Sequence, residues 1–399
     1  DRGEITQLDV RNSYDFSPTN RTPLPPPLPM AEWMGFGGWY IRDANWFPNF
    51  PTSAAWIEWF WNYYYGESTS GVIAFDEEVI KQLLVATGPI DLPELNEHIT
   101  ADNFRDRMRY WLYEAGSPTG ERLFVRSSKT PFVKLLGNAL FERVLNFSPG
   151  DLARFAPTLL KLLDEKHLQL ALKDGPAAAL LAQHGWDGHV DRSTPDYFLA
   201  SDTTVSYSKI APFVAETIDD QVQLQSDGST RADVVVSYAN NYDPSLVQNT
   251  YPRPYLGEFW NRATRKRDFS EGYYATYLRL YLPEAAHSIE LTGGDEALTN
   301  DLESGRRVVA TFLALPKGVQ RTIHLHYELP PGTWSDGKPY RLRVQKQSGT
   351  LSLPLTVKVT APAGSMLSES STHETTWTSD LLVDRNFQAT VVRASARAR

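Results

Sequence analysis

The sequence predicts two successive folds, an α/β domain over residues 1–200 and an all-β sandwich over residues 201–393. The chain has 399 residues, and chains of that size usually divide into two or three domains. Helix-length patterns alternate with short strand patterns in the first half of the chain. After Ser201 the helical periodicity ends and strand-like segments recur at short intervals, which is typical of a sandwich.

The composition excludes several kinds of site. There are 48 acidic and 39 basic residues, and the net charge of −9 argues against nucleic acid as the main partner, because a phosphate backbone binds a basic face. The sequence contains no cysteine, which excludes disulfides, thiolate zinc sites and cysteine nucleophiles. No run of about 18 apolar residues is present, so we expect no membrane span in this chain.

The first thirty residues predict a short strand and a stiff connection. Ile5–Val10 alternates apolar and polar side chains as a strand does. Five prolines between Pro23 and Pro29 favour an extended segment that packs on a surface, although such segments also serve as recognition ligands. Because the chain begins at Asp1 without methionine, we expect a larger precursor that is anchored to a membrane at its N-terminus.

Residues 39–51 are the segment on which the functional interpretation depends. Arg42 and Asp43 stand there between bulky aromatic residues. A charge that is partly removed from water needs a partner, so the two residues either form a structural ion pair or bind a ligand. The functional alternative makes both residues catalytic candidates.

The aromatic segment is expected to continue into a buried helix. Two prolines predict that this helix does not begin before Thr52, and Ser53–Tyr65 is apolar on nearly all sides. Six of the eleven tryptophans lie between Trp33 and Trp61. Such rings either stack on carbohydrate or fill a core, and the surrounding apolar pattern favours the core.

The next segment has the order strand, helix, strand. Ser70–Phe75 is a short apolar run, Asp76 is placed to cap a helix that ends near Ala86, and Ile90–Leu92 resumes an extended pattern. This order is typical of an α/β layer. The remaining elements predicted for this domain are helices over residues 100–115, 131–147 and from 148 onward, a strand over 168–172, a helix over 176–184 and a last strand over 197–200.

A basic cluster precedes the helix that is expected to begin at Thr130. Arg122, Arg126 and Lys129 lie at its entrance, and a helix N-terminus attracts anions. With Arg42 they form a candidate cradle for phosphate or pyrophosphate. The histidine pairs lack zinc-site spacing, and the sequence has neither a Gly-x-Ser-x-Gly elbow nor a Walker loop.

The second half predicts an immunoglobulin-like sandwich with one long insertion. Alternation over residues 308–314 and 323–329 predicts that each strand has one buried face. The insertion over residues 240–272 carries a basic cluster that either contacts an acidic partner or is simply solvated. Residues 394–399 are expected to fray. The basic residues of the insertion are Arg262, Arg265, Lys266 and Arg267.

Several motifs in this order resemble the bacterial domain of unknown function 4012 family. They are Trp-Tyr-Ile-Arg-Asp-Ala-Asn-Trp-Phe-Pro-Asn-Phe-Pro at residues 39–51, Gly-Val-Ile-Ala-Phe-Asp at 71–76, Thr-Gly-Pro-Ile at 87–90 and Thr-Ala-Asp-Asn at 100–103. Gln-Lys-Gln-Ser-Gly-Thr at residues 345–350 also looks like the C-terminal region of that family. The likeness therefore extends over most of the chain.

That family is similar in turn to the LytR-CpsA-Psr proteins, which are membrane-anchored enzymes. They move glycopolymers from polyprenyl-pyrophosphate carriers onto the cell wall, with arginines holding the pyrophosphate and aspartates holding magnesium. The resemblance implies a layered α/β/α domain and a location outside the cytoplasm. If the chain is catalytic, it implies Mg²⁺ with Asp43 and Asp76 as ligands.

The sequence departs from the family pattern at two carboxylates and at its start. Asn49 and Ser70 stand where the family usually has aspartate, which removes two charges that a cation needs. The family's opening strand would precede Asp1, so we expect the sheet to be completed by a preceding segment or by another envelope protein.

Three functions follow from these expectations. We favour a non-catalytic structural or binding protein of the cell envelope or cell surface. The alternatives are a phosphotransferase acting on lipid-linked pyrophosphate and glycopolymer, and a carbohydrate-binding surface module. The first predicts internal partners for Arg42 and Asp43, whereas the second predicts a cleft in which arginines and carboxylates converge.

Overall fold

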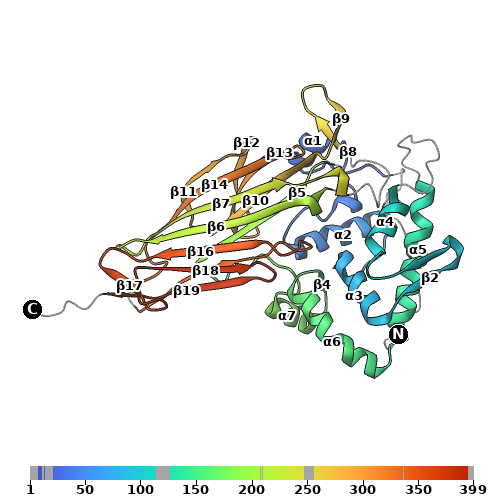
Figure 1. Cartoon of the computed structure of the whole chain (residues 1–399), viewed down its shortest axis with the longest axis horizontal. Coiled ribbons are helices and arrows are strands. Elements are labelled where there is room, and N and C mark those ends of the chain that lie inside the picture. The colour runs from blue at the N-terminus through green and yellow to red at the C-terminus, as the bar shows by residue number, and fades with distance from the viewer. Residues whose placement is uncertain are drawn as a thin grey trace, which may run out of the picture. The chain divides into compact units, whose positions relative to one another are not determined.

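The computed structural model describes residues 8–10, 13, 21–113, 126–206, 208, 210–246, 256–335 and 337–393 (Figure 1). By its internal contacts the chain divides into two compact units. Unit 1 comprises Asp1–Leu24 and Trp39–His189, and unit 2 comprises Pro25–Gly38 and Val190–Arg399. The boundary predicted at residue 200 falls inside a strand of unit 2, so the change of unit lies earlier, after His189.

Unit 1 is mainly helical in its described part. Two short 3-10 helices, η2 (Ile41–Asp43) and η3 (Pro93–Leu95), accompany its α-helices. The strand predicted over residues 5–10 lies mostly outside the described residues, and residues 8–10 are not in a strand. The α-helices are α2 (Phe50–Tyr65), α3 (Glu77–Thr87), α4 (Phe104–Tyr113), α5 (Arg126–Leu145), α6 (Pro149–Asp164) and α7 (Gly175–His184).

Local sequence explains where these helices begin. Asp76 caps α3 by accepting from the Glu78 backbone N–H, and Ser148 forms a capping box with Asp151 at α6. The expected start of α2 at Thr52 is wrong. The helix begins at Phe50, because a proline is tolerated in the first turn, where its missing N–H has no helical acceptor.

The strands of unit 1 form two antiparallel pairs. β1 (Gly71–Phe75) pairs with β4 (Leu168–Leu172), and β2 (Ile90–Leu92) pairs with β3 (Glu97–Ile99). The predicted order of strand, helix, strand is therefore present along the chain as β1, α3 and β2. The two strands have different partners, however, and do not form a parallel crossover with each other.

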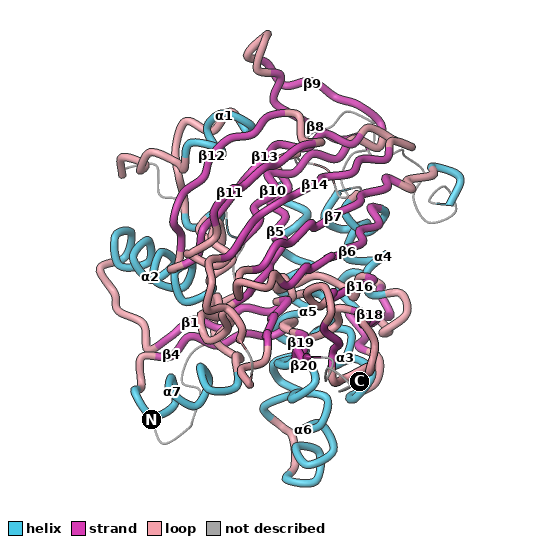
Figure 2. Tube along the Cα trace, turned by 90° about the vertical axis from the view of Figure 1, so that its left-hand side faces the viewer, coloured by secondary structure: helices cyan, strands magenta, loops and turns pink. Residues whose placement is uncertain are grey.

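Unit 2 contains two six-stranded sheets. Their order is β12-β13-β10-β5-β15-β19 in the first sheet and β11-β14-β7-β6-β16-β18 in the second. Figure 2 shows these strands running side by side. Their bounds are β5 (Asp196–Thr204), β6 (Val214–Leu224), β7 (Thr230–Asn240), β10 (Tyr274–Leu282), β11 (His287–Thr292), β12 (Glu296–Glu303), β13 (Arg306–Leu315), β14 (Gln320–Leu329), β15 (Tyr340–Val344), β16 (Pro354–Thr360), β18 (Glu374–Asp380) and β19 (Arg385–Ala389).

One apolar core joins the two sheets. It includes Leu278 and Leu313 from the first sheet and Val234 and Leu325 from the second. The β-rich second half is therefore as predicted. Each sheet also holds one parallel pair, β5 with β15 and β6 with β16, which differs from the all-antiparallel sheets of an immunoglobulin sandwich.

Further small elements complete unit 2. The insertion over residues 240–272 contains the 3-10 helix η5 (Pro244–Leu246) and a hairpin of β8 (Leu256–Asn261) with β9 (Lys266–Glu271). A 3-10 helix, η4 (Ala211–Phe213), precedes β6, and β17 (Ser365–Leu367) pairs with β20 (Val391–Arg393). The expected tail, residues 394–399, lies outside the described residues.

Residues 25–38, which include most of the proline-rich segment, belong to unit 2 although they lie near the start of the given sequence. They contain the short helix α1 (Leu28–Met34), whose Trp33 stacks on Phe312 of β13 with ring centroids 3.6 Å apart. Arg262 of the insertion lies over the same indole at 4.2 Å. Leu28 and Pro29 of the proline-rich segment are thus helical and not extended, and the contact with β13 is made by Trp33, which follows that segment.

No helix in the described parts of the chain is both long and apolar enough to cross a membrane.

Candidate functional site

Arg42 and Asp43 lie together in η2, where the structure pairs them with each other. Arg42 Nε is 3.5 Å from Asp43 Oδ2, and the two side chains are 22% and 16% exposed. The Arg42 guanidinium also lies over the Tyr40 ring, 4.3 Å from its centroid. A cation over an aromatic face gains electrostatic energy, so Arg42 has two stabilising contacts within its own segment.

An aromatic cluster fixes the backbone of this segment. The Trp39 indole Nε1 donates to the carbonyl oxygen of Asp43 at 3.0 Å. The Trp39 ring, only 4% exposed, packs on Trp56 and Phe60 of α2 at centroid distances of 4.6 and 5.4 Å. The bend that carries the charged pair is therefore tied to the buried face of α2, as the aromatic pattern predicts.

Burial disfavours the ionised form of the Asp43 carboxyl group. Removal from water raises the pKa of Asp43 to about 6, and the neighbouring Arg42 guanidinium acts in the opposite direction. Oδ2 of Asp43 makes no hydrogen bond to the described residues, so the Arg42 ion pair is its main compensation. The pair is thus a largely buried contact within its own segment.

Asp76 is engaged at both oxygens. Its Oδ1 caps α3 at 2.9 Å from the Glu78 nitrogen, and its Oδ2 lies 2.6 Å from Nδ1 of His167. The His167 side chain is 3% exposed, and its Nε2 lies 3.9 Å from Oε2 of Glu165. Asp76 therefore caps a helix and contacts a buried imidazole, so each of its oxygens already has one partner within the fold.

Of the residues predicted to bind phosphate, only Arg42 has a side chain among the described residues. Arg122 lies outside the described residues, and Arg126 and Lys129 lie in the first turns of α5, where their side chains are outside them too. The expected helix start at Thr130 is wrong, because α5 begins at Arg126 and continues through Pro131. Among the described residues, no group of three or more histidines and carboxylates is placed to hold a metal ion.

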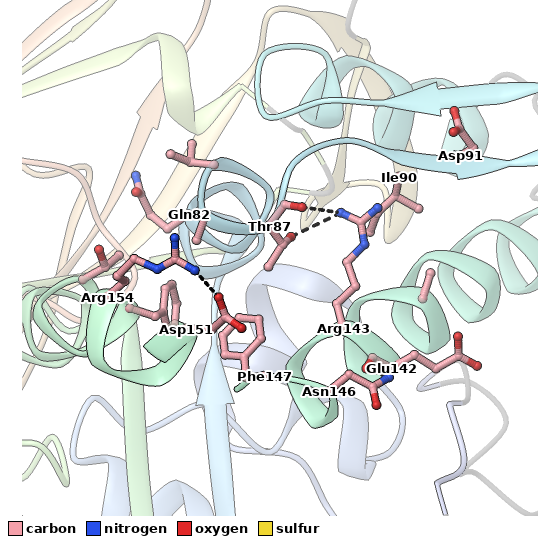
Figure 3. A pocket seen from close by; sticks show the side chains of 15 residues that line it. Gln82, Thr87, Ile90, Asp91, Glu142, Arg143, Asn146, Phe147, Asp151 and Arg154 are labelled. Carbon is pink, nitrogen blue, oxygen red and sulfur yellow. Dashed lines mark hydrogen bonds and ion pairs between the residues drawn. The ribbon is translucent and has the colours of Figure 1, made fainter. Parts of the chain in front are cut away.

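A groove in unit 1 was not predicted from the sequence (Figure 3). It has a volume of about 870 Å³ and lies between the end of α3, the start of β2, the end of α5 and the first turns of α6. None of the residues predicted to be functional lines it. The lining residues are Gln82, Val85, Ala86, Thr87, Ile90, Asp91, Ala139, Glu142, Arg143, Asn146, Phe147, Asp151, Arg154, Phe155 and Thr158.

Two arginines lie on opposite sides of this groove (Figure 3). Arg143 donates to the carbonyl oxygens of Thr87 and Gly88 at 3.0 and 2.6 Å, and also to that of Pro89. It therefore binds the free carbonyls at the end of α3, where a positive charge also suits the helix dipole. Arg154 pairs with Asp151 and is 81% exposed.

Sequence reasoning missed these residues for an identifiable reason. Arg143 and Arg154 lie on helices that read as ordinary amphipathic segments, and nothing in their spacing indicates a shared groove. The only local signal is the capping box, which fixes Asp151 at the start of α6 and hence the position of Arg154 one turn later.

Unit 2 holds buried carboxyl groups that the sequence did not indicate. Asp196, with no exposed surface, accepts from the hydroxyls of Tyr340 and Tyr327 at 2.5 and 2.9 Å. Burial raises its pKa to about 6, and these hydrogen bonds oppose the shift. Asp220 is equally buried, and neither of its oxygens has a hydrogen-bond partner among the described residues.

Comparison with known proteins gives weak structural likenesses. A Legionella pneumophila protein described as nutrient binding is 10% identical with a TM-score of 0.31, and the alignment covers 49% of this chain and 71% of that chain. Leukotriene A4 hydrolase from Saccharomyces cerevisiae is 8% identical with a TM-score of 0.23, covering 47% of this chain and 30% of the hydrolase. Scores this low support no conclusion about fold or activity.

The sequence comparisons are more informative about family than about function. No protein with a curated description matches the chain. The profile of a family described as "Protein of unknown function (DUF4012)" matches residues 1–113. This segment of the chain is therefore similar to the family that its motifs at residues 39–51, 71–76, 87–90 and 100–103 also resemble.

Proposed function

We propose that this chain is a non-catalytic structural or binding component of a cell envelope or cell surface. The observation that carries the proposal is the pairing of Arg42 with Asp43, at 3.5 Å, in a segment tied to α2 by Trp39. A pair that is engaged internally has less capacity to hold a substrate pyrophosphate. The position of Asp76, which caps α3 and contacts His167, supports the same conclusion.

The location outside the cytoplasm rests on the proposed relationship with LytR-CpsA-Psr proteins. The motif at residues 71–76, with its aspartate at the start of α3, supports that relationship. The two aspartates of the family pattern that are replaced by Asn49 and Ser70 support loss of catalysis, because a hard cation needs oxygen ligands that carry charge.

The proposal is tested by comparing activity with stability in one pair of variants. Release of phosphate from a polyprenyl pyrophosphate with Mg²⁺ is measured for the wild-type chain, Arg42→Ala and Arg21→Ala. Arg21 is the matched control, since its guanidinium also lies over a tyrosine, 5.4 Å from the Tyr63 ring, but on the surface.

We expect no phosphate release from any of the three proteins. We also expect Arg42→Ala to lower the free energy of unfolding by about 2 kcal/mol, because it leaves a half-buried carboxylate without its partner. Arg21→Ala should change that free energy by no more than about 0.5 kcal/mol. Magnesium-dependent release by the wild type that is lost in Arg42→Ala would overturn the proposal in favour of a phosphotransferase.

The location is tested separately. Intact cells that produce the protein are treated with a membrane-impermeant lysine reagent, with a cytoplasmic protein as the internal control. Labelling of this chain in intact cells at the level seen in lysed cells is expected. Labelling only after lysis contradicts the proposed location.

A further inference from the structure

We propose that the groove between α3, α5 and α6 binds a neutral oligosaccharide. The inference deepens the binding role proposed above and rests on it, because it names a site and a ligand class for that role. It uses the described residues of unit 1 alone, and it does not involve Arg42, Asp43 or Asp76.

The charges around the groove favour a neutral ligand. An anion between Arg143 and Arg154 would lie beside the carboxylate of Asp151, which pairs with Arg154 (Figure 3). A cation in the same place would lie between two guanidinium groups. Because like charges at close range repel and both signs are present, a ligand with no net charge is bound with the smallest electrostatic penalty.

The groove offers hydrogen-bond donors and acceptors together. The amide groups of Gln82 and Asn146 donate to Glu78 Oε1 and to the Glu142 carbonyl at 2.7 and 2.8 Å, so their oxygens remain available as acceptors. Arg154, which pairs with Asp151, has further N–H groups that face solvent. The hydroxyl of Thr158 makes no hydrogen bond to the described residues. Sugar hydroxyls both donate and accept, so they match this mixture.

Two phenylalanines supply an apolar surface beside these polar groups. Phe147 and Phe155 pack edge to face with centroids 6.0 Å apart, and both line the groove. The C–H faces of a sugar ring pack on such rings, because they are the apolar part of an otherwise polar molecule. A mixed wall of this kind is typical of a site that orients a polar ligand by a few placed groups.

The shape of the groove argues against a peptide ligand. Its walls are mostly the ends of three helices, which do not present the long strand edge that an extended peptide pairs with. A volume of about 870 Å³ lies within the range of small-molecule sites and is sufficient for more than one sugar ring.

The test is saturation-transfer NMR on the whole chain with three neutral disaccharides, namely maltose, cellobiose and diacetylchitobiose. Binding in the millimolar range is expected for at least one of them. Gln82→Leu and Thr158→Val remove one polar group each at nearly constant volume. Each should weaken binding by about threefold to tenfold, which is the usual effect of one lost hydrogen bond. Gln183→Leu, on the exposed side of α7 outside the groove, is the matched control and should bind as the wild type does.

Three results would overturn the inference. They are the absence of binding by all three disaccharides, binding that Gln82→Leu and Thr158→Val leave unchanged, and displacement of the disaccharide by an uncharged tripeptide. Thermal melting of each variant separates loss of binding from loss of folding. None of these results bears on phosphate release, so the failure of this inference is distinguishable from the failure of the proposed function.

Discussion

The carboxyl group of Asp220 is the least compensated polar group among the described residues of the unit 2 core. Strict alternation along β6 places it on the inner face with Ile218 and Val222, and none of its surface is exposed. Burial raises the pKa of Asp220 well above its usual range, and the nearby charges of Asp196, Asp219 and Asp233 raise it further. The folded chain therefore holds a proton on Asp220 that the unfolded chain releases.

Asp220→Asn should stabilise unit 2 increasingly as the pH rises. A carboxyl group whose pKa is raised by folding gives full stability below its unfolded pKa, near 4, and loses stability from there up to its folded pKa. Asparagine does not titrate, so the difference in free energy of unfolding between variant and wild type should grow by about 1.4 kcal/mol for each pH unit in this window. Urea unfolding at pH 5, 6 and 7 measures it.

Glu290→Gln is the control for that measurement, because it changes an exposed carboxylate on β11 of the same sheet that is not among the charges acting on Asp220. A difference that stays constant with pH for Asp220→Asn would contradict the assignment of the buried proton. Sequence alone could not locate this proton. The alternation of β6 identifies the inner face. A carboxyl group at an inner position looks like a break in that alternation, and its burial is established only when its neighbours in the fold are known.

The connection between β15 and β16 shows what one sequence motif does for the fold. It carries Gln-Lys-Gln-Ser-Gly-Thr at residues 345–350 and joins the first sheet to the second. The side-chain oxygen of Gln345 accepts from the Asp191 backbone nitrogen and the Tyr197 hydroxyl at 3.0 and 2.7 Å. Lys346 is 1% exposed and donates to the carbonyls of Gln347 and Thr350 at 3.2 and 2.6 Å. The motif thus stabilises the connection between the two sheets by buried hydrogen bonds.

Gln345→Leu should lower the free energy of unfolding of unit 2 by about 2 kcal/mol. The substitution leaves the buried Tyr197 hydroxyl and the Asp191 nitrogen without their acceptor, and an unpaired buried donor costs its full desolvation energy. Gln388→Leu, on the exposed side of β19, should have an effect of no more than about 0.5 kcal/mol. Urea unfolding of both variants makes the comparison, and equal effects would contradict a structural role for the motif.

At the scale of elements, a helix start predicted from the sequence is correct where a single capping side chain determines it. Asp76 caps α3 as expected, and α6 begins beside residue 148 as expected, where Ser148 is its cap. Such a cap needs only a hydrogen bond over two or three residues. The starts of α2 and α5 were wrong, because prolines near a helix start are compatible with either boundary. The sequence identifies Arg42 and Asp43 as candidate site residues. That they pair with each other depends on the backbone conformation of η2, which sequence patterns do not determine.

At the scale of the whole molecule, unit 2 is made from two stretches that lie far apart in the sequence, Pro25–Gly38 and Val190–Arg399. Trp33 of α1 is 8% exposed and lies between Phe312 of β13 and Arg262 of the hairpin β8–β9. The expected pattern of one buried face per strand is wrong for β13. Val309 and Leu313 face the core between the sheets, while Val308 and Phe312 are buried on the opposite face. Sequence patterns did not assign α1 to this face, because the contact joins residues far apart in the chain.

Trp33→Ala should therefore destabilise the C-terminal unit, although the residue lies among the first forty of the chain. Loss of a buried tryptophan costs about 3 kcal/mol. Hydrogen exchange should accelerate in β13 and remain unchanged in α2. Trp59→Ala, which removes a 40% exposed ring from α2, is the control and should affect α2 alone. Faster exchange in α2 with β13 unaffected would contradict the assignment of α1 to unit 2.

The split composition of unit 2 has a consequence for the order in which the polypeptide is made. Pro25–Gly38 emerges from the ribosome before any strand of its own unit exists, and all of Trp39–His189 follows before β5 appears. During that interval Trp33 has no ring to stack on, so the nascent chain carries an uncovered apolar segment at residues 28–34. The sandwich can close over α1 only after synthesis has passed β13, and this delay makes the early segment a natural target for a chaperone.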